Sequence, residues 1–385
     1  MNPQLIHKQR LLPRVRRAVL KIGSSILSGP DGIDRARLHT RAEEICRLHE
    51  QGMEIVVVSS GAVAAGMARL RMNDRPKTVP QRQAAAAVGQ IHLMVLYEES
   101  FAAFSTQVAQ ILLTHDDLAD RSRYLNARHT IETLIAAGVI PVANENDTVV
   151  IDELRHFGDN DNLSALIAGL VEADLLVLLS DVAGLYTTDP RAHADAKLVS
   201  VVEDPERAAS AYAMHGSGPL GTGGMASKFA AAVKAAAAGI PTAIADGLHA
   251  GVLPKVFDAG EAVGTLVLPK SDRLTRRKHW IAYTLKPSGT VVVDKGAHEA
   301  ITQRGRSLLP KGVTHVQGRF SSGACVRCVD THGREFARGL VNYSAAELGK
   351  IKGVHSARIE AVLGYKLTDE VIHRDNLVLT ATSRV

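Results

Sequence analysis

The feature that most constrains the fold is a repeated alternation of short apolar runs and longer helical segments over the first two-thirds of the 385-residue chain. Met53–Val58 is a continuous β-branched run, typical of a strand buried on both faces. The segment before it begins at Asp34, a good N-cap, and ends at Gly52, as a helix would. Further strands are expected at Ala18–Ile22, Val108–Leu113, Val139–Ala143, Leu175–Leu179 and Pro241–Ala245, and further helices at Leu125–Ala137, Asn162–Leu170 and Met225–Ala238. This pattern predicts an α/β fold with a mainly parallel open sheet sandwiched by helices.

The pattern changes after about Asp272, where short strands separated by glycines replace the alternation. We expect a frayed basic leader at 1–16, a large α/β domain at 17–272 and a basic connector at 273–286. A small β-rich domain at 287–370 and a C-terminal tail at 371–385 should follow. The strands expected in the second domain are Thr290–Val293, Gly312–Val316, Cys325–Val329 and Phe336–Val341.

The composition, 46% hydrophobic and 22% charged, is that of an ordinary globular protein. No apolar run reaches the roughly 18–20 residues that a membrane-spanning helix needs. The basic N-terminus lacks the apolar stretch of a secretory signal, and three cysteines make no disulfide framework. We therefore expect a cytoplasmic protein with no membrane association.

The net positive charge of the chain lies in the predicted second domain. Pro287–Lys366 contains 12 Lys and Arg against 6 Asp and Glu, whereas the whole chain has a net charge of +5. This excess fits two alternatives equally well: a surface that binds an anionic partner such as RNA, or an ordinary basic surface in contact with water.

Cys325 and Cys328 form a C-x-x-C within a predicted strand. No second cysteine pair or nearby histidine at zinc spacing accompanies them, and an offset of three places two strand residues on opposite faces. We expect two inert strand cysteines rather than a metal or redox site.

Four glycine- or Asx-rich segments each follow a predicted strand, so all four should meet at the carboxyl edge of one sheet. The first contains Lys21 and Gly23, which offer an ammonium and backbone N–H groups to phosphate oxygens. The second, Ser59-Ser60-Gly61-Ala62, offers donors to a carboxylate. Each of these two segments, taken alone, also fits an ordinary strand-end turn.

The third segment contains two clusters of short amides and carboxylates, Asn144-Glu145-Asn146-Asp147 and Gly158-Asp159-Asn160-Asp161-Asn162. Together they supply both acceptors for an ammonium and donors for a carboxylate, as a zwitterionic amino acid requires. Turns and helix caps are the alternative, with Asp161 as a cap, while the spacing does not match an EF-hand calcium loop.

The fourth segment, Gly221-Thr222-Gly223-Gly224-Met225-Ala226-Ser227-Lys228, opens an alanine-rich helix. Glycines let the backbone approach phosphates, the helix N-terminus adds partial positive charge, and Lys228 can reach a β- or γ-phosphate. The segment is neither a Walker A motif nor a dinucleotide fingerprint. Ser180-Asp181 ends another strand, and we expect Asp181 to hold Lys21 and Lys228 apart and in place.

Taken together, these segments resemble the glutamate 5-kinase family of the amino-acid-kinase superfamily, over about Ala18 to Lys366. The resemblance also rests on Gly184-Leu185-Tyr186-Thr187 and Asp189-Pro190-Arg191, and the basic tail resembles a PUA domain. One departure is an extra residue before Gly158, which we assign to His156.

The resemblance implies transfer of phosphate from ATP to the side-chain carboxylate of L-glutamate, giving glutamyl 5-phosphate in the first step of proline synthesis. It also implies a Mg²⁺-dependent homo-oligomer, dimer or tetramer, inhibited by proline. The catalytic residues would be Lys21, Lys228 and Asp181, with no protein metal ligand assigned. ATP would be bound by Lys21, Ser180, Asp181, Thr222, Gly223, Gly224, Met225, Ala226, Ser227 and Lys228, and glutamate by Ser60, Asn144, Asp147, Asn160 and Asp161.

Two other functions stay open from the sequence. One is a related kinase with another acceptor, such as aspartate or acetylglutamate. The other is an RNA-binding or RNA-modifying protein built around the tail domain. The complete set of kinase-like segments ahead of that tail argues against this second function.

Overall fold

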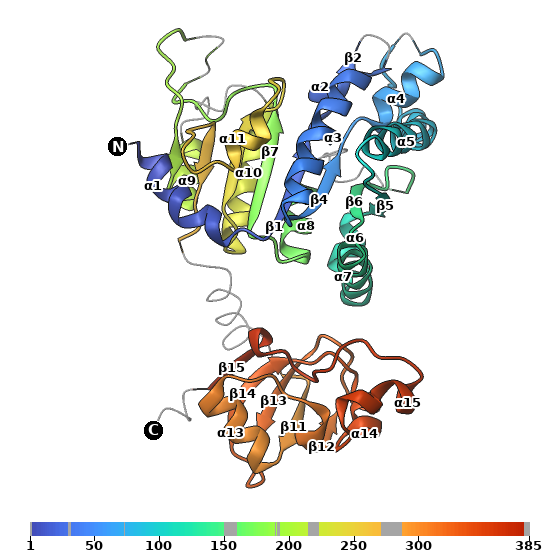
Figure 1. Cartoon of the computed structure of the whole chain (residues 1–385), viewed down its shortest axis with the longest axis vertical. Helices are drawn as coiled ribbons and strands as arrows, with labels where there is room; N and C mark the ends of the chain where they lie inside the picture. The colour runs from blue at the N-terminus through green and yellow to red at the C-terminus, as the bar shows by residue number, and fades with distance from the viewer. Residues whose placement is uncertain are drawn as a thin grey trace. The chain divides into compact units, whose positions relative to one another are not determined.

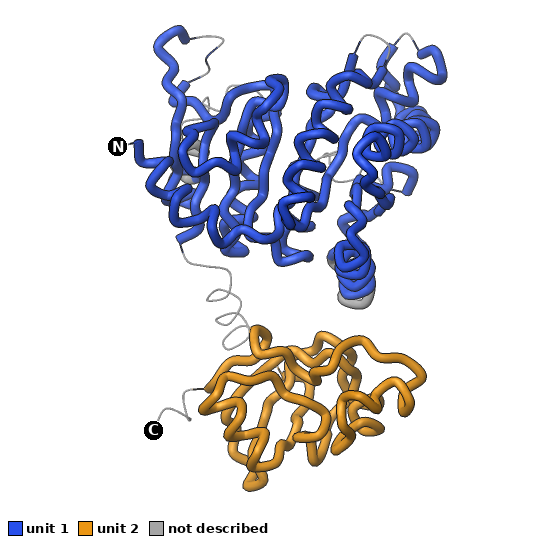
Figure 2. Tube along the Cα trace, viewed as in Figure 1, with its two compact units in different colours: residues 1–270 blue, residues 271–385 orange. Residues whose placement is uncertain are grey.

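The computed structural model describes residues 2–29, 32–72, 74–149, 160–188, 190, 193–214, 223–270 and 287–380. The chain divides into two compact units, Met1–Lys270 and Ser271–Val385 (Figure 2). The segment 273–286, expected as a connector, lies outside the described residues.

The first unit contains an eight-stranded sheet in the order β5-β6-β4-β1-β7-β9-β10-β8. The first six of these strands run parallel, β10 is antiparallel to β9, and β8 is parallel to β10. The prediction of a mainly parallel sheet is therefore confirmed. The strands are β1 (Arg17–Ile22), β4 (Glu54–Ser59), β5 (Val108–Leu113), β6 (Ile140–Glu145), β7 (Leu175–Ser180), β8 (Val201–Val202), β9 (Thr242–Asp246) and β10 (Thr265–Val267).

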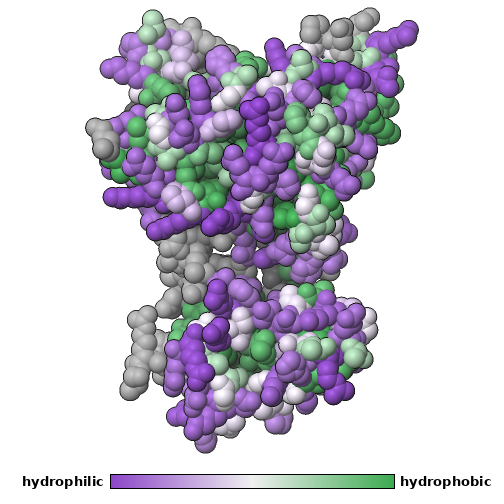
Figure 3. Space-filling view, viewed as in Figure 1, coloured by the Kyte–Doolittle hydropathy of each residue, from purple (hydrophilic) through white to green (hydrophobic). Residues whose placement is uncertain are grey.

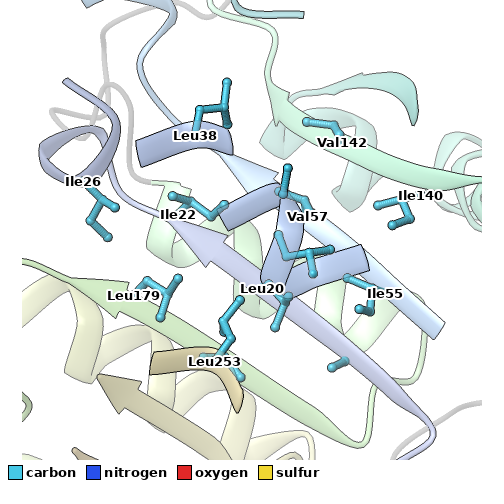
Figure 4. Packing of buried hydrophobic residues seen from close by; sticks show 14 of the residues in the cluster. Leu20, Ile22, Ile26, Leu38, Ile55, Val57, Ile140, Val142, Leu179 and Leu253 are labelled. Carbon is cyan, nitrogen blue, oxygen red and sulfur yellow. The ribbon is translucent and has the colours of Figure 1, made fainter. Parts of the chain in front are cut away.

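Helices cover both faces of this sheet (Figure 1). One face packs against α3 (Arg35–Glu50), α5 (Val79–Ala102) and α11 (Val252–Val256), and the other against α7 (Arg121–Ala136), α8 (Asn160–Leu170) and α10 (Gly223–Ala237). Side-chain alternation along β1 separates the two cores, as expected for a strand. Leu20 and Ile22 lie in the core with Leu38 of α3 (Figure 4), whereas Val19 lies in the opposite core.

Several shorter elements complete the first unit. They are α2 (Ser24–Leu27), α4 (Ala62–Arg69), α6 (His115–Ala119), α9 (Pro205–Met214) and the small hairpin of β2 (Ser28–Gly29) and β3 (Gly32–Ile33). The longest helix is α5, which begins at a capping box formed by Thr78 and Gln81. Among the described residues, no helix combines the length and the apolar character that crossing a membrane requires.

The N-terminal segment differs from the prediction of a frayed leader. It forms helix α1 (Pro3–Leu11), with Gln4 and Lys8 buried. The Lys8 ammonium donates to the backbone oxygens of Lys255 at 2.8 Å and Glu261 at 2.6 Å. Burial lowers the pKa of Lys8 to about 8, with Asp258 and Glu261 opposing the shift. The basic charge of this segment predicted that it would be frayed. Lys8 instead donates to backbone oxygens, and these hydrogen bonds anchor α1.

The second unit is β-rich, as predicted, but it also contains helices. Its five-stranded sheet has the order β12-β11-β13-β14-β15. The elements are β11 (Gly289–Val293), α13 (Lys295–Arg304), β12 (Val313–Gly318), β13 (Cys325–Val329), β14 (Glu335–Leu340), α14 (Ala345–Ile351), α15 (Ile359–Leu363) and β15 (Leu377–Leu379). The expected tail 371–385 thus supplies an edge strand, and Val371 and Ile372 lie in the core.

The two cysteines of the C-x-x-C lie on β13, both buried, and contribute to different apolar clusters. This is the arrangement expected of strand residues three apart. Burial raises the pKa of both thiols, that of Cys328 to about 12.

Helices α4 and α5 pack with their backbones in contact, because small residues line both. A Cβ atom at Gly89 would lie 1.8 Å from the backbone oxygen of Ala62, and one at Gly66 would lie 1.7 Å from that of Ala85. Helix α4 follows directly after Ser59, Ser60 and Gly61, so this packing fixes where that turn lies.

We predict that Gly89→Ala lowers the urea midpoint of unfolding, corresponding to about 1–3 kcal/mol of overpacking. Gly169→Ala is the matched control, because Gly169 lies within α8 and a Cβ there meets nothing within 4 Å. Alanine favours a helix over glycine, so this control should be neutral or stabilising by up to about 1 kcal/mol. Equal midpoints for the two variants would contradict the close packing.

Candidate active site

The carboxyl ends of adjacent parallel strands bring the polar segments to one edge of the sheet, as the sequence predicts. Ile22 of β1 is paired with Ser59 of β4 and with Leu179 of β7. The N-termini of α8 and α10 meet the same edge from one face.

Two lysines from distant segments share one carboxylate at this edge. The Lys21 ammonium lies 2.6 Å from Oδ1 of Asp161, and the Lys228 ammonium lies 3.2 Å from Oδ2. All three side chains are buried, with Asp161 5% exposed. Burial would raise the pKa of Asp161, but the charges and hydrogen bonds of Lys21 and Lys228 outweigh it and hold that pKa below its usual range. The group carries two positive charges against one negative charge, so it suits a further anion.

Local structure explains why these three residues meet. Val19 packs against the face of the sheet that α8 and α10 cover, and strand alternation directs Lys21, two residues on, to that face. Asp161 lies in the first turn of α8 and Lys228 near the start of α10. The Ser227 hydroxyl also donates to Oδ2 of Asp161 at 3.2 Å.

The geometry corrects two expectations. Helix α8 begins at Asn160 rather than Asn162, so Asn160 and Asp161 are helical residues rather than loop residues. The bridging position expected for Asp181 is occupied by Asp161, since α8 extends its first turn between the two lysines. Asp181 is exposed, and its carboxylate accepts from the Ser180 hydroxyl at 3.3 Å.

A network of side-chain amides lies beside the lysines. The Asn160 Nδ2 group donates to the backbone oxygen of Ser59 at 2.9 Å, to the Ser60 hydroxyl at 2.9 Å and to Oδ1 of Asn144 at 3.0 Å. Two of the residues expected to bind glutamate, Ser60 and Asn144, thus each contact a third, Asn160. This places them in one site but leaves the ligand they bind a prediction.

Asp147 is also buried, just beyond the end of β6. Burial raises its pKa to about 7, and the neighbouring Glu145 carboxylate adds to the shift. An acid with such a pKa is poised to become charged when a cation arrives.

The predicted nucleotide segment is described only in part. Thr222 lies outside the described residues, as do the assigned insertion at His156 and Asp189 and Arg191 of the resemblance. Gly223, Gly224, Met225, Ala226 and Ser227 form the start of α10, where Met225 is buried and a Cβ at Gly224 would meet nothing within 4 Å.

Sequence reasoning missed two residues of α5 that contact the site. The Gln90 amide oxygen accepts from Asn144 Nδ2 at 2.8 Å, and the fully buried Tyr97 hydroxyl donates to the Ser59 hydroxyl at 2.9 Å. Burial raises the pKa of Tyr97, so its hydroxyl stays a donor. The capping signal of Thr78 and Gln81 before an apolar segment could have revealed α5, though not its contacts. Within the described ranges, no group of three or more His, Cys, Asp or Glu side chains could hold a metal ion.

Comparison with known proteins agrees with this fold and site. Residues 16–246 match the model of the amino acid kinase family, and residues 289–363 match that of the PUA domain. Glutamate 5-kinase from Citrifermentans bemidjiense is 53% identical over 97% of this chain and 100% of its own length. Glutamate 5-kinase from Geobacter metallireducens is 54% identical, over 96% of this chain and 99% of its own length, and that from Thioalkalivibrio sulfidiphilus is 52% identical, over 96% and 98%. The chain therefore belongs to the amino acid kinase family and, within it, to the glutamate 5-kinases.

We predict that Asp161→Asn lowers the free energy of unfolding by about 3–5 kcal/mol, because it leaves two buried ammonium groups without their shared counter-charge. The control is Glu99→Gln, which removes the partner of Arg35 from an exposed pair at 3.0 Å and should cost no more than about 1 kcal/mol. Chemical denaturation of the full chain compares the two variants. Similar small losses would show that Asp161 does not neutralise the lysines.

Proposed function

We propose that this chain transfers the terminal phosphoryl group of ATP to the side-chain carboxylate of L-glutamate, producing ADP and glutamyl 5-phosphate. This is the first step of L-proline biosynthesis. The observation that carries the proposal is the convergence of Lys21 and Lys228 on Asp161, directly beside the Asn144–Asn160 amide network. The family to which the chain belongs supports the same reaction.

The reaction needs no general base. A glutamate side chain, with a pKa near 4.3, is already ionised at neutral pH. The obstacle is repulsion between an attacking carboxylate and a polyphosphate, roughly 4 kcal/mol for two unit charges about 4 Å apart at an effective dielectric near 20. Phosphoryl transfer is therefore catalysed chiefly by positioning and by stabilisation of charge.

Lys21 and Lys228 supply that stabilisation in our proposal. An ammonium has three N–H donors, so each lysine can bind Asp161 and still donate to phosphate oxygens. The start of α10, from Thr222 to Lys228, would hold the phosphates through backbone N–H groups, and Ser180 and Asp181 would complete the ATP site. Asp161 would keep the two ammonium groups a fixed distance apart while the phosphoryl group passes between substrates.

Mg²⁺ is the cofactor we propose, bound mainly through the phosphates of ATP, as is usual in kinases. When bound, it would neutralise charge that develops on the transferring group. No residue of this chain is assigned as its ligand.

Glutamate would be held by Ser60, Asn144, Asp147, Asn160 and Asp161. Asp147, with Glu145 beside it, would pair with the ammonium of the substrate. Ser60 and the turn at Gly61 would donate to a carboxylate.

We further propose a homo-oligomer, dimer or tetramer, in the cytoplasm, inhibited by proline. Val88, Ile91 and Val95 of α5 support an oligomer, because they follow one another at helical spacing and are 38%, 72% and 41% exposed. Hydrophobic surface is visible in Figure 3 at the edge where Figure 1 shows α4 and α5. The second unit, which contains the PUA domain, is basic, so RNA is a further partner to test.

The direct test is ATP turnover that depends on L-glutamate, with hydroxylamine trapping the acyl phosphate product. We expect Lys21→Ala and Lys228→Ala each to lower kcat by about 10²–10³, with a smaller effect on the KM for glutamate. The control is Lys234→Ala, because Lys234 lies further along α10, is exposed, and contacts Asn162 instead of Asp161. Turnover with aspartate or acetylglutamate but not glutamate would contradict the assigned substrate. A near-normal kcat in Lys228→Ala would contradict the assigned active site.

The pKa of Asp147 predicts how glutamate binding depends on pH. Below about pH 7 this carboxyl is mostly neutral, and above it the carboxylate can pair with the ammonium of the substrate, which stays protonated over this range. The KM for glutamate should therefore fall as the pH rises from 6 to 8. In Asp147→Asn the KM should be higher and lose this dependence. An identical pH profile in the variant would contradict the pairing.

A further inference from the structure

Gln90 of α5 helps to hold the orientation of the Asn144 amide. The amide oxygen of Gln90 accepts a hydrogen bond from Asn144 Nδ2 at 2.8 Å. An asparagine side chain donates at one end and accepts at the other, so Oδ1 of Asn144 must point away from Gln90. There it accepts from Asn160 Nδ2 at 3.0 Å and from the backbone N–H of Glu145 at 2.9 Å.

Asn144 and the backbone oxygen of Ser59 together orient the Asn160 amide. The Nδ2 group of Asn160 has two hydrogens, and three acceptors surround it: Asn144 Oδ1, the Ser59 backbone oxygen and the Ser60 hydroxyl. Its donors are therefore fully used within the protein. Its Oδ1 atom is buried and accepts no hydrogen bond within the described part of the chain.

A buried acceptor without a partner destabilises the protein, so this atom favours a ligand that brings a donor. Glu145 and Asp147 follow Asn144 within three residues, and both are buried and interact with one another. Their charge favours a cation over a carboxylate at the end of β6, the strand end that Asn160 contacts through Asn144.

We propose that Gln90 is a positioning residue that sets the direction of the Gln90–Asn144–Asn160 relay, so that Asn160 accepts a hydrogen bond from the ammonium group of the amino-acid substrate. This inference rests on the proposed function, which it extends to the recognition of the amine. Gln90 itself contacts Asn144 rather than the substrate. Its effect is to support, together with the Glu145 N–H and the Ser59 backbone oxygen, the orientation that leaves Asn160 Oδ1 for the ligand.

The test compares Gln90→Leu with Gln90→Glu in the full-length enzyme. Leucine cannot accept a hydrogen bond, so Nδ2 of Asn144 loses its partner and only the Glu145 N–H and Asn160 still hold the amide. We therefore expect the KM for glutamate to rise about tenfold. The kcat and the KM for ATP should change by less than about threefold, which also shows that the variant is folded. Gln90→Glu keeps an acceptor at this position and should restore a KM within about threefold of the original.

Two measurements separate positioning from a merely structural role. Glutarate is a five-carbon diacid without the amine, so the preference for glutamate over glutarate in kcat/KM should decrease in Gln90→Leu. The second is the effect of Gln90→Leu in an Asn144→Asp background. A carboxylate accepts from Asn160 in either orientation, so the effect of Gln90→Leu should shrink to less than about twofold there.

An unchanged KM for glutamate in an active Gln90→Leu enzyme would overturn this inference, as would equal losses in Gln90→Leu and Gln90→Glu. So would an unchanged preference over glutarate. The original enzyme is the control for the proposed function. Absence of any glutamate-dependent turnover in the original enzyme overturns that function. Normal turnover in the original enzyme, with an unchanged KM for glutamate in Gln90→Leu, overturns the inference alone.

Discussion

The structure depends on placing two ammonium groups at the edge of a buried sheet without leaving their charge uncompensated. Asp161 pairs with both Lys21 and Lys228, at 2.6 and 3.2 Å, in surroundings that would otherwise disfavour all three ions. One carboxylate for two ammonium groups leaves a net positive charge. The same arrangement that keeps the resting protein stable therefore attracts a polyphosphate, and it links strand β1 to the N-termini of α8 and α10.

The substrate side of the site is held by hydrogen bonds and close packing rather than by charge. Tyr97 and Gln90 of α5 fix Ser59 and Asn144, and Asn160 joins both to the helix that carries Asp161. Contact between the glycine-lined backbones of α4 and α5 holds the turn between Ser59 and α4. Small displacements of α5 would therefore change the geometry at the ends of β4 and β6, although α5 packs on the face of the sheet opposite to α8 and α10.

The sequence predicted the sheet and the polar segments at its edge because both follow from local patterns. Continuous β-branched runs mark buried parallel strands, and residues after such strands share one edge. It did not predict that Asp161 rather than Asp181 bridges the lysines, because that depends on where α8 begins. Helix α5 and its contacts through Gln90 and Tyr97 were missed since their partners are 38 or more positions away. The anchoring of α1 by Lys8 likewise requires carbonyl oxygens more than 200 residues distant.

The central claim is that two distant ammonium groups act on one nucleotide. A crystal structure with a non-hydrolysable ATP analogue and glutamate tests it most directly. The account predicts both ammonium nitrogens within about 3 Å of β- or γ-phosphate oxygens, with the carboxylate of Asp161 still between them. Phosphates held elsewhere on the chain, or in contact with neither Lys21 nor Lys228, would contradict it.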